Sequence, residues 1–527
     1  MVRLNLDSNP PRSPFFKGGR NGRRKTHNSS PLWQRGDRGD FSSNSRIKKF
    51  CALPFALSSL LLFVLAFLAG CSVGPDYVRP TMNVPAGYKE IDGWKTAQPQ
   101  DDALRGPWWE MFGDAELNGL QSQIDISNQN IAAAEAAFHQ ARALVQQARA
   151  QYFPTVTIGF GVSNSSASTT TVLGSRTQRT NRTLHSLPLD VSWEIDVWGR
   201  VRRLVESQSA GAQASAADLE TVRLSARAEL AQNYFQLRAL DTEKRLLDET
   251  VASYQKSLEL TQNRYAAGVV SRADVLQAET LLKTTQSQAI DIGVQRAQLE
   301  HAIALLVGKS PAEITIPPEP LNISPPVIPV GFPSQLLERR PDVAAAERLV
   351  TQANALIGVA EAAYFPTVSL TASVGFDSAT FSKLISGPSR FWSVGAAVSQ
   401  TVFDGGLRQA QTEEARAVFE STVAQYRQTV LAGFQEVENN LAALRILESE
   451  ALVQDEAVKA ARQTVAVLTN QYTAGIVNYL DVIVVQTAAL NNQRTAISIL
   501  GNRLIASVLL IKALGGGWIA SDLPVSP

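Results

Sequence analysis

The chain has 527 residues, of which 45% are apolar and 18% are charged, with 49 Lys and Arg against 48 Asp and Glu. This balance excludes a basic nucleic-acid binder and a disordered acidic chain. The two cysteines are too few for a disulfide-stapled fold or a multi-cysteine metal site, and the four histidines lie far apart without an HExxH motif.

The basic residues are concentrated at the start of the chain. Residues 1–70 hold 12 Lys and Arg and 3 Asp and Glu, which leaves 37 basic and 45 acidic residues in the rest. An apolar run over residues 50–69 is followed by Cys71, and this order is typical of a secretory signal peptide. Leu68-Ala69-Gly70-Cys71 resembles a bacterial lipobox, which implies a lipidated, N-terminal Cys71. Ser72 behind it favours the outer membrane by the same resemblance, and an uncleaved membrane anchor is the alternative.

The rest of the sequence contains one unit twice. Residues 141–156 (ARALVQQARAQYFPTV) correspond to residues 353–368 (ANALIGVAEAAYFPTV) at a shift of 212. Residues 263–268 (NRYAAG) correspond to residues 470–475 (NQYTAG) at a shift of 207. The predicted divisions are a leader and signal peptide 1–70, an extended segment 71–113, a first copy 114–310, a proline-rich linker 311–333, a second copy 334–517 and a tail 518–527.

Each copy contains the same elements in the same order. An alanine-rich helix is expected at about 125–151 and again at 341–363, and Tyr-Phe-Pro ends both because proline disfavours helix at the residue before it. Two strands, a very long proline-free helix, a glycine turn and a returning helix follow. The segment 199–265 would form a helix about 100 Å long, which is too long for the core of a compact domain.

The four predicted strands alternate between apolar and polar residues, so their sheet should have one apolar face. They are 155–163, 187–198, 368–376 and 392–398. A soluble β-sandwich face is the alternative interpretation. In a bilayer, open sheet edges are not tolerated and single-chain barrels begin at about eight strands, so this sheet would need several chains to close. Asp190, Glu194 and Asp196 would then line a wet lumen.

The turns between the long and returning helices have clear signals. Gly268 and Gly475 occupy the position after a helix at which a left-handed residue is favoured. The segments 271–274 (SRAD) and 478–481 (NYLD) are capping boxes that should open the returning helices.

At this point the sequence resembles the TolC-type outer-membrane factors, in the NodT-type lipoprotein branch that serves resistance–nodulation–division efflux pumps. The order, spacing and duplication of the motifs carry the resemblance. The motifs are Cys71, Trp108-Trp109, Phe112-Gly113-Asp114, Leu117, Tyr152-Phe153-Pro154, Asp196-Val197-Trp198-Gly199-Arg200, Tyr265-Ala266-Ala267-Gly268, Leu336-Leu337-Glu338-Arg339-Arg340-Pro341-Asp342, Tyr364-Phe365-Pro366 and Phe403-Asp404-Gly405-Gly406.

The resemblance implies a mainly α fold with a small transmembrane β-barrel, in which each protomer gives four strands and long coiled-coil helices. It implies a homotrimer with a twelve-stranded β-barrel above an α-helical barrel. The implied function is a non-enzymatic, passive exit duct for drugs or other small toxic compounds, anchored by lipid in the outer membrane. A periplasmic adaptor and an inner-membrane transporter would be its partners, with no nucleic acid and no cofactor apart from the lipid on Cys71.

The resemblance also implies roles at the periplasmic tip. Asp481 falls on an acidic ring at the channel constriction, and Asp274 and Tyr472 fall on positions whose contacts hold the tip shut. The tip turns and their packing involve Tyr265, Gly268, Tyr472 and Gly475. Val477 and Val484 depart from the family pattern of a basic latch and a second acidic ring, and helix capping alone is the alternative role of both aspartates. A type I protein-secretion channel and a non-pore periplasmic coiled-coil tether are the competing functions.

Overall fold

The computed structural model describes residues 72–91, 106–166, 181–328, 330–331, 336–518, 521 and 523. All of them belong to one unit, Phe67–Pro527. The predicted lipidation site, Cys71, lies outside the described residues.

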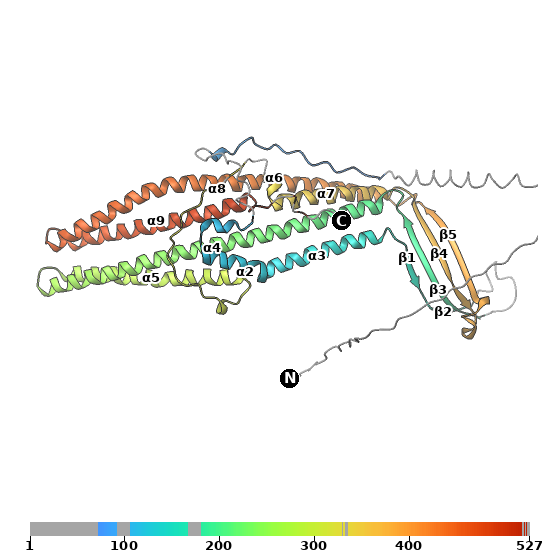
Figure 1. The fold of residues 1–527 in the computed structure, drawn as a ribbon, viewed down its shortest axis with the longest axis horizontal. Helices are drawn as coiled ribbons and strands as arrows, with labels where there is room; N and C mark the ends of the chain where they lie inside the picture. Colours follow the sequence, from blue (N-terminus) through green and yellow to red (C-terminus); the bar gives the residue numbers. More distant parts are fainter. Residues whose placement is uncertain are drawn as a thin grey trace, which may run out of the picture. The chain divides into compact units, whose positions relative to one another are not determined.

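The duplication is visible in the lengths of the helices (Figure 1). The long helices α4 and α8 have 67 residues each, the returning helices α5 and α9 have 35 each, and α3 and α7 have 22 each. The domain boundaries drawn from the sequence stay a prediction. The helices are α2 (Ala115–Ser127), α3 (Gln129–Ala150), α4 (Arg200–Ala266), α5 (Arg272–Leu306), α6 (Leu336–Arg339), α7 (Pro341–Ala362), α8 (Leu407–Thr473) and α9 (Tyr479–Ala513).

The first predicted helix, at about 125–151, is wrong in its start. Asn128 is extended and separates α2 from α3, and its side chain accepts hydrogen bonds from the N–H groups of Asn130 and Ile131. Its amide nitrogen donates to the carbonyl oxygen of Leu306 at 2.7 Å, which ties this break to the end of α5. Asn128 therefore caps α3 and also satisfies an unpaired carbonyl at another helix end.

The strands form one antiparallel sheet in the order β1–β3–β4–β5, with β2 also paired to β3. They are β1 (Thr155–Ile158), β2 (Gly161–Ser166), β3 (Asn181–Ile195), β4 (Thr367–Ser378) and β5 (Arg390–Ser399). β1 and β2 keep one register against β3, and the gap between them faces Pro188, which has no N–H to donate. β1 and β2 together therefore correspond to the first predicted strand, and the expected sheet of four strands is present.

The predicted second strand, 187–198, is wrong at its end because β3 stops at Ile195. The Asp196 carboxylate instead accepts hydrogen bonds from the N–H groups of Val201 and Arg202, at 2.9 and 3.0 Å. This acidic side chain caps the start of α4, which needs acceptors for its unpaired N–H groups.

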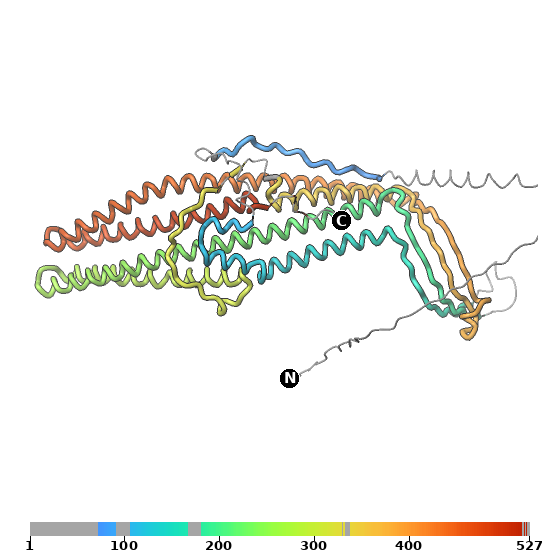
Figure 2. The backbone as a smooth tube through the Cα atoms, viewed as in Figure 1, coloured from blue at the N-terminus to red at the C-terminus, as the bar shows by residue number. Residues whose placement is uncertain are grey.

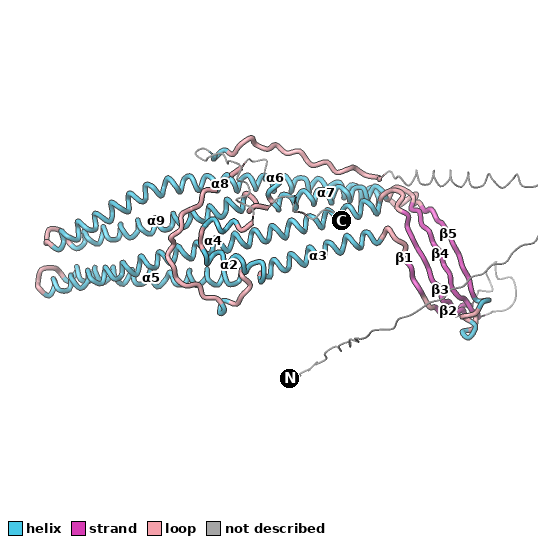
Figure 3. The backbone as a smooth tube through the Cα atoms, in the orientation of Figure 1, coloured by secondary structure: helices cyan, strands magenta, loops and turns pink. Residues whose placement is uncertain are grey.

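The main hydrophobic core lies where the helices of both copies meet. α4 packs against α3 and α5 from its own copy and against α7 and α9 from the other copy. Trp108 and Phe112 from the N-terminal segment pack there with Tyr234 and Phe235 of α4, all of them buried. Figure 3 shows the loop that joins the two copies crossing these helices.

The apolar helix α9 belongs to this core. Among the described helices, it is the one that is long and apolar enough to cross a bilayer by length and composition, with a mean hydropathy of 1.6 in its most apolar window. Half of that window is buried, and α9 packs against α4 and α8. Such a composition is also expected of a core helix.

The N-terminal segment from residue 72 to residue 90 runs beside α7 and α8 (Figure 2). Tyr77 donates to Glu347 at 3.3 Å, and the N–H groups of Lys89 and Glu90 donate to the Glu438 carboxylate at 2.7 and 3.0 Å. These hydrogen bonds hold the N-terminal segment against α7 and α8 of the second copy.

Candidate channel site: the sheet and the hairpin tips

One face of the sheet is apolar across β1, β3, β4 and β5. The register places Val156 opposite Val191, and Val191 opposite Ala372, which in turn faces Val394. Opposite residues share a face, so these side chains lie together. Trp392 and Val394 are each 75% exposed, while the ring of Phe381 packs on the same face farther along the sheet, against Phe160 and His185. A broad, exposed apolar surface of this kind marks a site of contact with lipid or with another protein.

The opposite face of the sheet is polar. Asp190 accepts a hydrogen bond from the Ser373 hydroxyl at 2.6 Å across the β3–β4 pair. Glu194 forms an ion pair with Arg200 at 3.0 Å. Asp190 and Glu194 lie on the predicted polar face, whereas Asp196 caps a helix instead.

Both edges of the sheet are open within the described residues. β1 and β2 pair only with β3, and β5 pairs only with β4. The outer N–H and C=O groups of these edge strands require partners if the sheet enters a membrane.

The Tyr-Phe-Pro motifs fix the sheet to the helices. The indole of Trp198 donates to the carbonyl oxygen of Pro366 at 2.7 Å and stacks on Phe365 at 4.9 Å between centroids. The indole of Trp193 donates to the carbonyl oxygen of Tyr152 at 3.0 Å. The polar contacts of the two tryptophans therefore hold the helix ends of both copies to one sheet.

The first described residues of the chain lie at this junction of sheet and helices. Ser72 contacts Gly199, and the N–H of Val73 donates to the carbonyl oxygen of Trp198 at 3.1 Å. Arg203, which is buried, forms an ion pair with Asp76 at 2.8 Å. The residue that follows Cys71 is therefore held where the strands end and the helices begin.

The glycine turns have the predicted geometry. Gly268 and Gly475 have φ values of 74° and 79°, and both turns carry the paired backbone hydrogen bonds of a Schellman motif. Asp274 and Asp481 each accept a hydrogen bond from the N–H of the residue that caps their helix, and both capping boxes are complete. Capping is thus confirmed for both aspartates. Among the described residues, neither carboxylate forms an ion pair, and their predicted roles in the channel stay predictions.

The tips of the two hairpins are joined by Arg264 and Tyr472. The Arg264 guanidinium donates to the carbonyl oxygen of Tyr472 at 2.6 Å and lies 4.6 Å from the centroid of its ring. Thr261 lies 3.4 Å from the Tyr472 hydroxyl, and Tyr479 packs on the same ring at 5.3 Å. We name this group of four residues the clasp. Tyr472 is only 3% exposed and Tyr265 is 47% exposed, and the packing roles expected of both residues at the tip stay predictions.

Sequence reasoning missed Arg264, Thr261 and Tyr479. One signal pointed to Arg264, because it stands in the duplicated motif at a position where the second copy has Gln471. Burial, with smaller effects of Tyr472 and Tyr254, raises the pKa of Tyr479 to about 12, so its hydroxyl is neutral at physiological pH.

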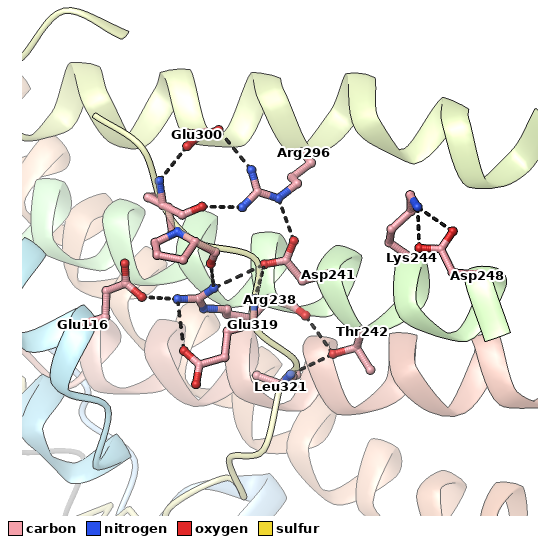
Figure 4. Close-up of polar contacts among 12 residues, drawn as sticks. Glu116, Arg238, Asp241, Thr242, Lys244, Asp248, Arg296, Glu300, Glu319 and Leu321 are labelled. Carbon is pink, nitrogen blue, oxygen red and sulfur yellow. Dashed lines mark hydrogen bonds and ion pairs between the residues drawn. The ribbon is translucent and has the colours of Figure 1, made fainter. Parts of the chain in front are cut away.

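A second polar cluster, also missed, fastens the linker between the copies (Figure 4). Arg238 is buried, contacts Glu116 and Asp241, and donates to the carbonyl oxygen of Pro317 at 2.6 Å. Arg296 binds Asp241 at 2.7 Å and donates to the carbonyl oxygen of Ile316 at 2.6 Å. Two arginines therefore hold the linker against α4 and α5. Among the described residues, no group of His, Cys, Asp and Glu side chains could hold a metal ion.

The sequence profile of a family described as "Outer membrane efflux protein" matches residues 120–309 and 332–516. The chain belongs to this family. It is the outer-membrane channel component of an efflux system rather than an enzyme.

Individual relatives agree with the family match. The chain is 31% identical over 466 residues to the "Toluene efflux pump outer membrane protein TtgC" of Pseudomonas putida. The aligned region covers 88% of this chain and 96% of that protein. It is 28% identical over 463 residues to the "Cation efflux system protein CusC" of Escherichia coli, with 87% and 98% covered. The solved structure of the outer-membrane channel OprN matches with a TM-score of 0.80 at 30% identity, over 85% of this chain and all of that chain.

Proposed function

We propose that three copies of this chain close into a channel that carries small compounds passively across the outer membrane. The single observation that carries the proposal is the amphipathic sheet, with its exposed apolar face and two open edges. A membrane tolerates this sheet only when neighbours pair both edges, and single-chain barrels begin at about eight strands. Three chains give twelve strands, with the apolar face toward lipid and Asp190 and Glu194 toward the lumen.

A lipid on Cys71 anchors the channel, as in the lipoprotein branch of the family. Ser72 is held at the junction of sheet and helices, beside Gly199. The apolar residues of the sheet begin a few residues from this junction, so acyl chains on residue 71 would enter the same bilayer leaflet. Two anchoring signals, lipid and barrel, then act together.

A periplasmic adaptor and an inner-membrane transporter of the resistance–nodulation–division class complete the efflux path. Drugs or other small toxic compounds are the cargo class. One relative is named for toluene and another for cations, so the channel type accepts chemically different cargo, and its partners select among compounds. At the tip, three copies of Asp481 form the acidic constriction, and Asp274 and Tyr472 help to close it.

The test combines mass and conductance. Protein purified in detergent is measured by light scattering and then added to planar lipid bilayers. We expect the mass of a trimer and discrete ion-conducting steps. A matched variant, Ala396→Pro in the edge strand β5, removes one backbone N–H and should reduce both the trimer and the conductance. A monomer without conductance would contradict the proposal.

A further inference from the structure

A pocket lies where the helices of the second copy meet the sheet. Its volume is about 460 Å³. Its walls come from Val73 of the N-terminal segment, from Tyr364 and Phe365 after α7, and from the end of α7 and the first turns of α8. Figure 2 shows the N-terminal segment beside both helices. One wall of the pocket therefore depends on the course of that segment.

The pocket lies close to the start of the apolar face of the sheet. Phe365 is three residues before Val368 of β4, which pairs with Val398, and Val398 is 71% exposed on that face. Three extended residues span at most about 10 Å. The headgroup layer is roughly 5–8 Å thick on each side of the apolar core of a bilayer. When the sheet spans a membrane, the headgroups of the periplasmic leaflet therefore lie at the level of the pocket.

Charges of both signs line the pocket. Arg416 of α8 donates to Glu361 of α7 at 2.9 Å, and the Arg416 side chain is 60% exposed. Glu413 accepts a hydrogen bond from the side-chain amide of Gln409 at 3.0 Å and, among the described residues, forms no ion pair. The pocket thus contains a guanidinium with N–H donors to spare and a carboxylate without a cation.

The first copy has a different set of charges at the equivalent place, 207 residues earlier. Ser209 stands at the position of Arg416, so the guanidinium is missing. The equivalent of Glu413 is Glu206, and its carboxylate forms an ion pair with the buried Arg203 at 2.9 Å. The repeated fold therefore does not require an unpaired carboxylate beside an arginine, which is specific to the copy that carries the N-terminal segment.

A zwitterionic phospholipid headgroup matches this arrangement. A guanidinium binds phosphate through two parallel hydrogen bonds, as Arg416 could do. A primary ammonium has three N–H donors, of which Glu413 can accept one or more. Choline has no N–H donor and a glycerol headgroup has no cation, so phosphatidylethanolamine alone of these three lipids satisfies both groups. Tyr364, which is 44% exposed, suits the boundary between headgroups and acyl chains.

We propose that this pocket binds the headgroup of a phosphatidylethanolamine molecule in the periplasmic leaflet, with its phosphate on Arg416 and its ammonium on Glu413. The inference rests on the proposed function, because it needs the sheet to span the outer membrane. Val73 is two residues from Cys71, so the bound phospholipid lies beside the lipid anchor proposed there. Its headgroup fills the space between the N-terminal segment and α8.

Native mass spectrometry of the detergent-solubilised protein tests the ligand. Phosphatidylethanolamine, phosphatidylcholine and phosphatidylglycerol with identical acyl chains are added to separate samples at equal concentrations. We expect phosphatidylethanolamine to bind about tenfold more tightly than the other two, because a hydrogen bond between charged groups is equivalent to about one decade or more in a binding constant. Equal binding of the three lipids overturns the proposal.

Two variants test the site. Glu413→Gln keeps the length of the side chain but removes its charge, so the binding of phosphatidylethanolamine should fall about tenfold, to the level of phosphatidylcholine. Arg416→Gln should weaken the binding of all three lipids. Glu249→Gln and Arg245→Gln are the matched controls, since they change an exposed ion pair roughly 65 Å from the start of α4 and should leave lipid binding unchanged. Full binding of phosphatidylethanolamine by Glu413→Gln or Arg416→Gln would show that the lipid lies elsewhere.

The same samples separate this inference from the proposed function. The mass spectra also give the number of chains, and planar bilayers give the conductance. A conducting trimer without a preference for phosphatidylethanolamine overturns the lipid site and leaves the channel intact. A monomer without conductance overturns the channel and, with it, the position of the pocket at a membrane.

Discussion

The sheet and the helical region use apolar residues in opposite ways. In the sheet, Trp392, Val394 and Val398 of β5 are large apolar residues that are 75%, 75% and 71% exposed. In the helices around α4, Tyr234 and Phe235 are fully buried. The helices therefore contain a core that is stable in water, whereas the sheet requires an apolar environment that the chain itself does not supply. This difference locates the membrane at the sheet.

The strongest test of this comparison places a charge on each face of β5. Val394→Arg puts a cation on the apolar face, which should cost about 2–4 kcal/mol if the residue lies near the middle of the bilayer. Ser393→Arg puts the same cation on the polar face and should cost little. Urea titration of protein folded into lipid vesicles measures both values. Equal losses would contradict a lipid-facing apolar surface.

In the helical region the largest effect should come from the buried linker cluster. Arg238→Met leaves Glu116 without its partner and leaves Asp241 with Arg296 alone, and breaking a buried ion pair costs about 3–5 kcal/mol. Arg245→Met removes an exposed pair with Glu249 and should cost less than about 1 kcal/mol. The denaturation midpoints of the detergent-solubilised variants give the comparison. Similar midpoints would show that the cluster does not stabilise the linker.

The glycine turns at the two ends of the returning helices should also differ. Gly268 has a positive φ but open space around it, so Gly268→Ala should cost about 1–2 kcal/mol, the usual strain of a left-handed residue. A Cβ at Gly515 would also overlap the carbonyl oxygen of Arg339. Gly515→Ala should therefore be more destabilising in thermal unfolding, and the opposite order would contradict this packing.

At the tip, Arg264→Gln replaces the arginine of the clasp by the residue that the second copy has at the equivalent position, Gln471. We expect higher mean conductance in planar bilayers, with little change in the denaturation midpoint because the core is untouched. Arg264→Lys keeps the charge but loses the planar guanidinium, so its conductance should lie between the two. If the mean conductance is unchanged in both variants, the clasp does not keep the tip closed.

The smallest effect concerns Asp481. Asp481→Ala should weaken the block of conductance by multivalent cations, because the proposed trimer would place three carboxylates near one axis, where they would attract such cations. The matched variant Asp481→Asn keeps an acceptor oxygen for the helix cap but removes the charge, so it separates the effect of the charge from that of helix capping. A block that is unchanged in Asp481→Ala leaves only the capping role.

Local patterns in the sequence predicted most of the fold. The alternation in residues 155–163, the repeated Tyr-Phe-Pro motif and the two capping boxes each depend on residues close together in the chain, and the structure contains all of them. The predicted strand end at residue 198 was wrong, because the strand stops at Ile195 and the Asp196 carboxylate accepts hydrogen bonds from the start of a nearby helix.

The contacts that sequence reasoning missed join distant residues. Asn128 breaks its helix to reach Leu306, and Arg238 is satisfied by carbonyl and carboxylate groups from three separate segments. The clasp joins Arg264 to a residue 208 positions later. No periodicity or spacing reveals such partners, because they depend on how complete helices pack. Only the difference between Arg264 and Gln471 in the two copies gave a hint.

Electron microscopy of the protein in lipid nanodiscs tests the central claim most directly. The account predicts a particle with three-fold symmetry, in which β5 of each chain pairs with β1 and β2 of the next chain in a closed cylinder of twelve strands. A particle with one chain, or with a free sheet edge in contact with water, would contradict it.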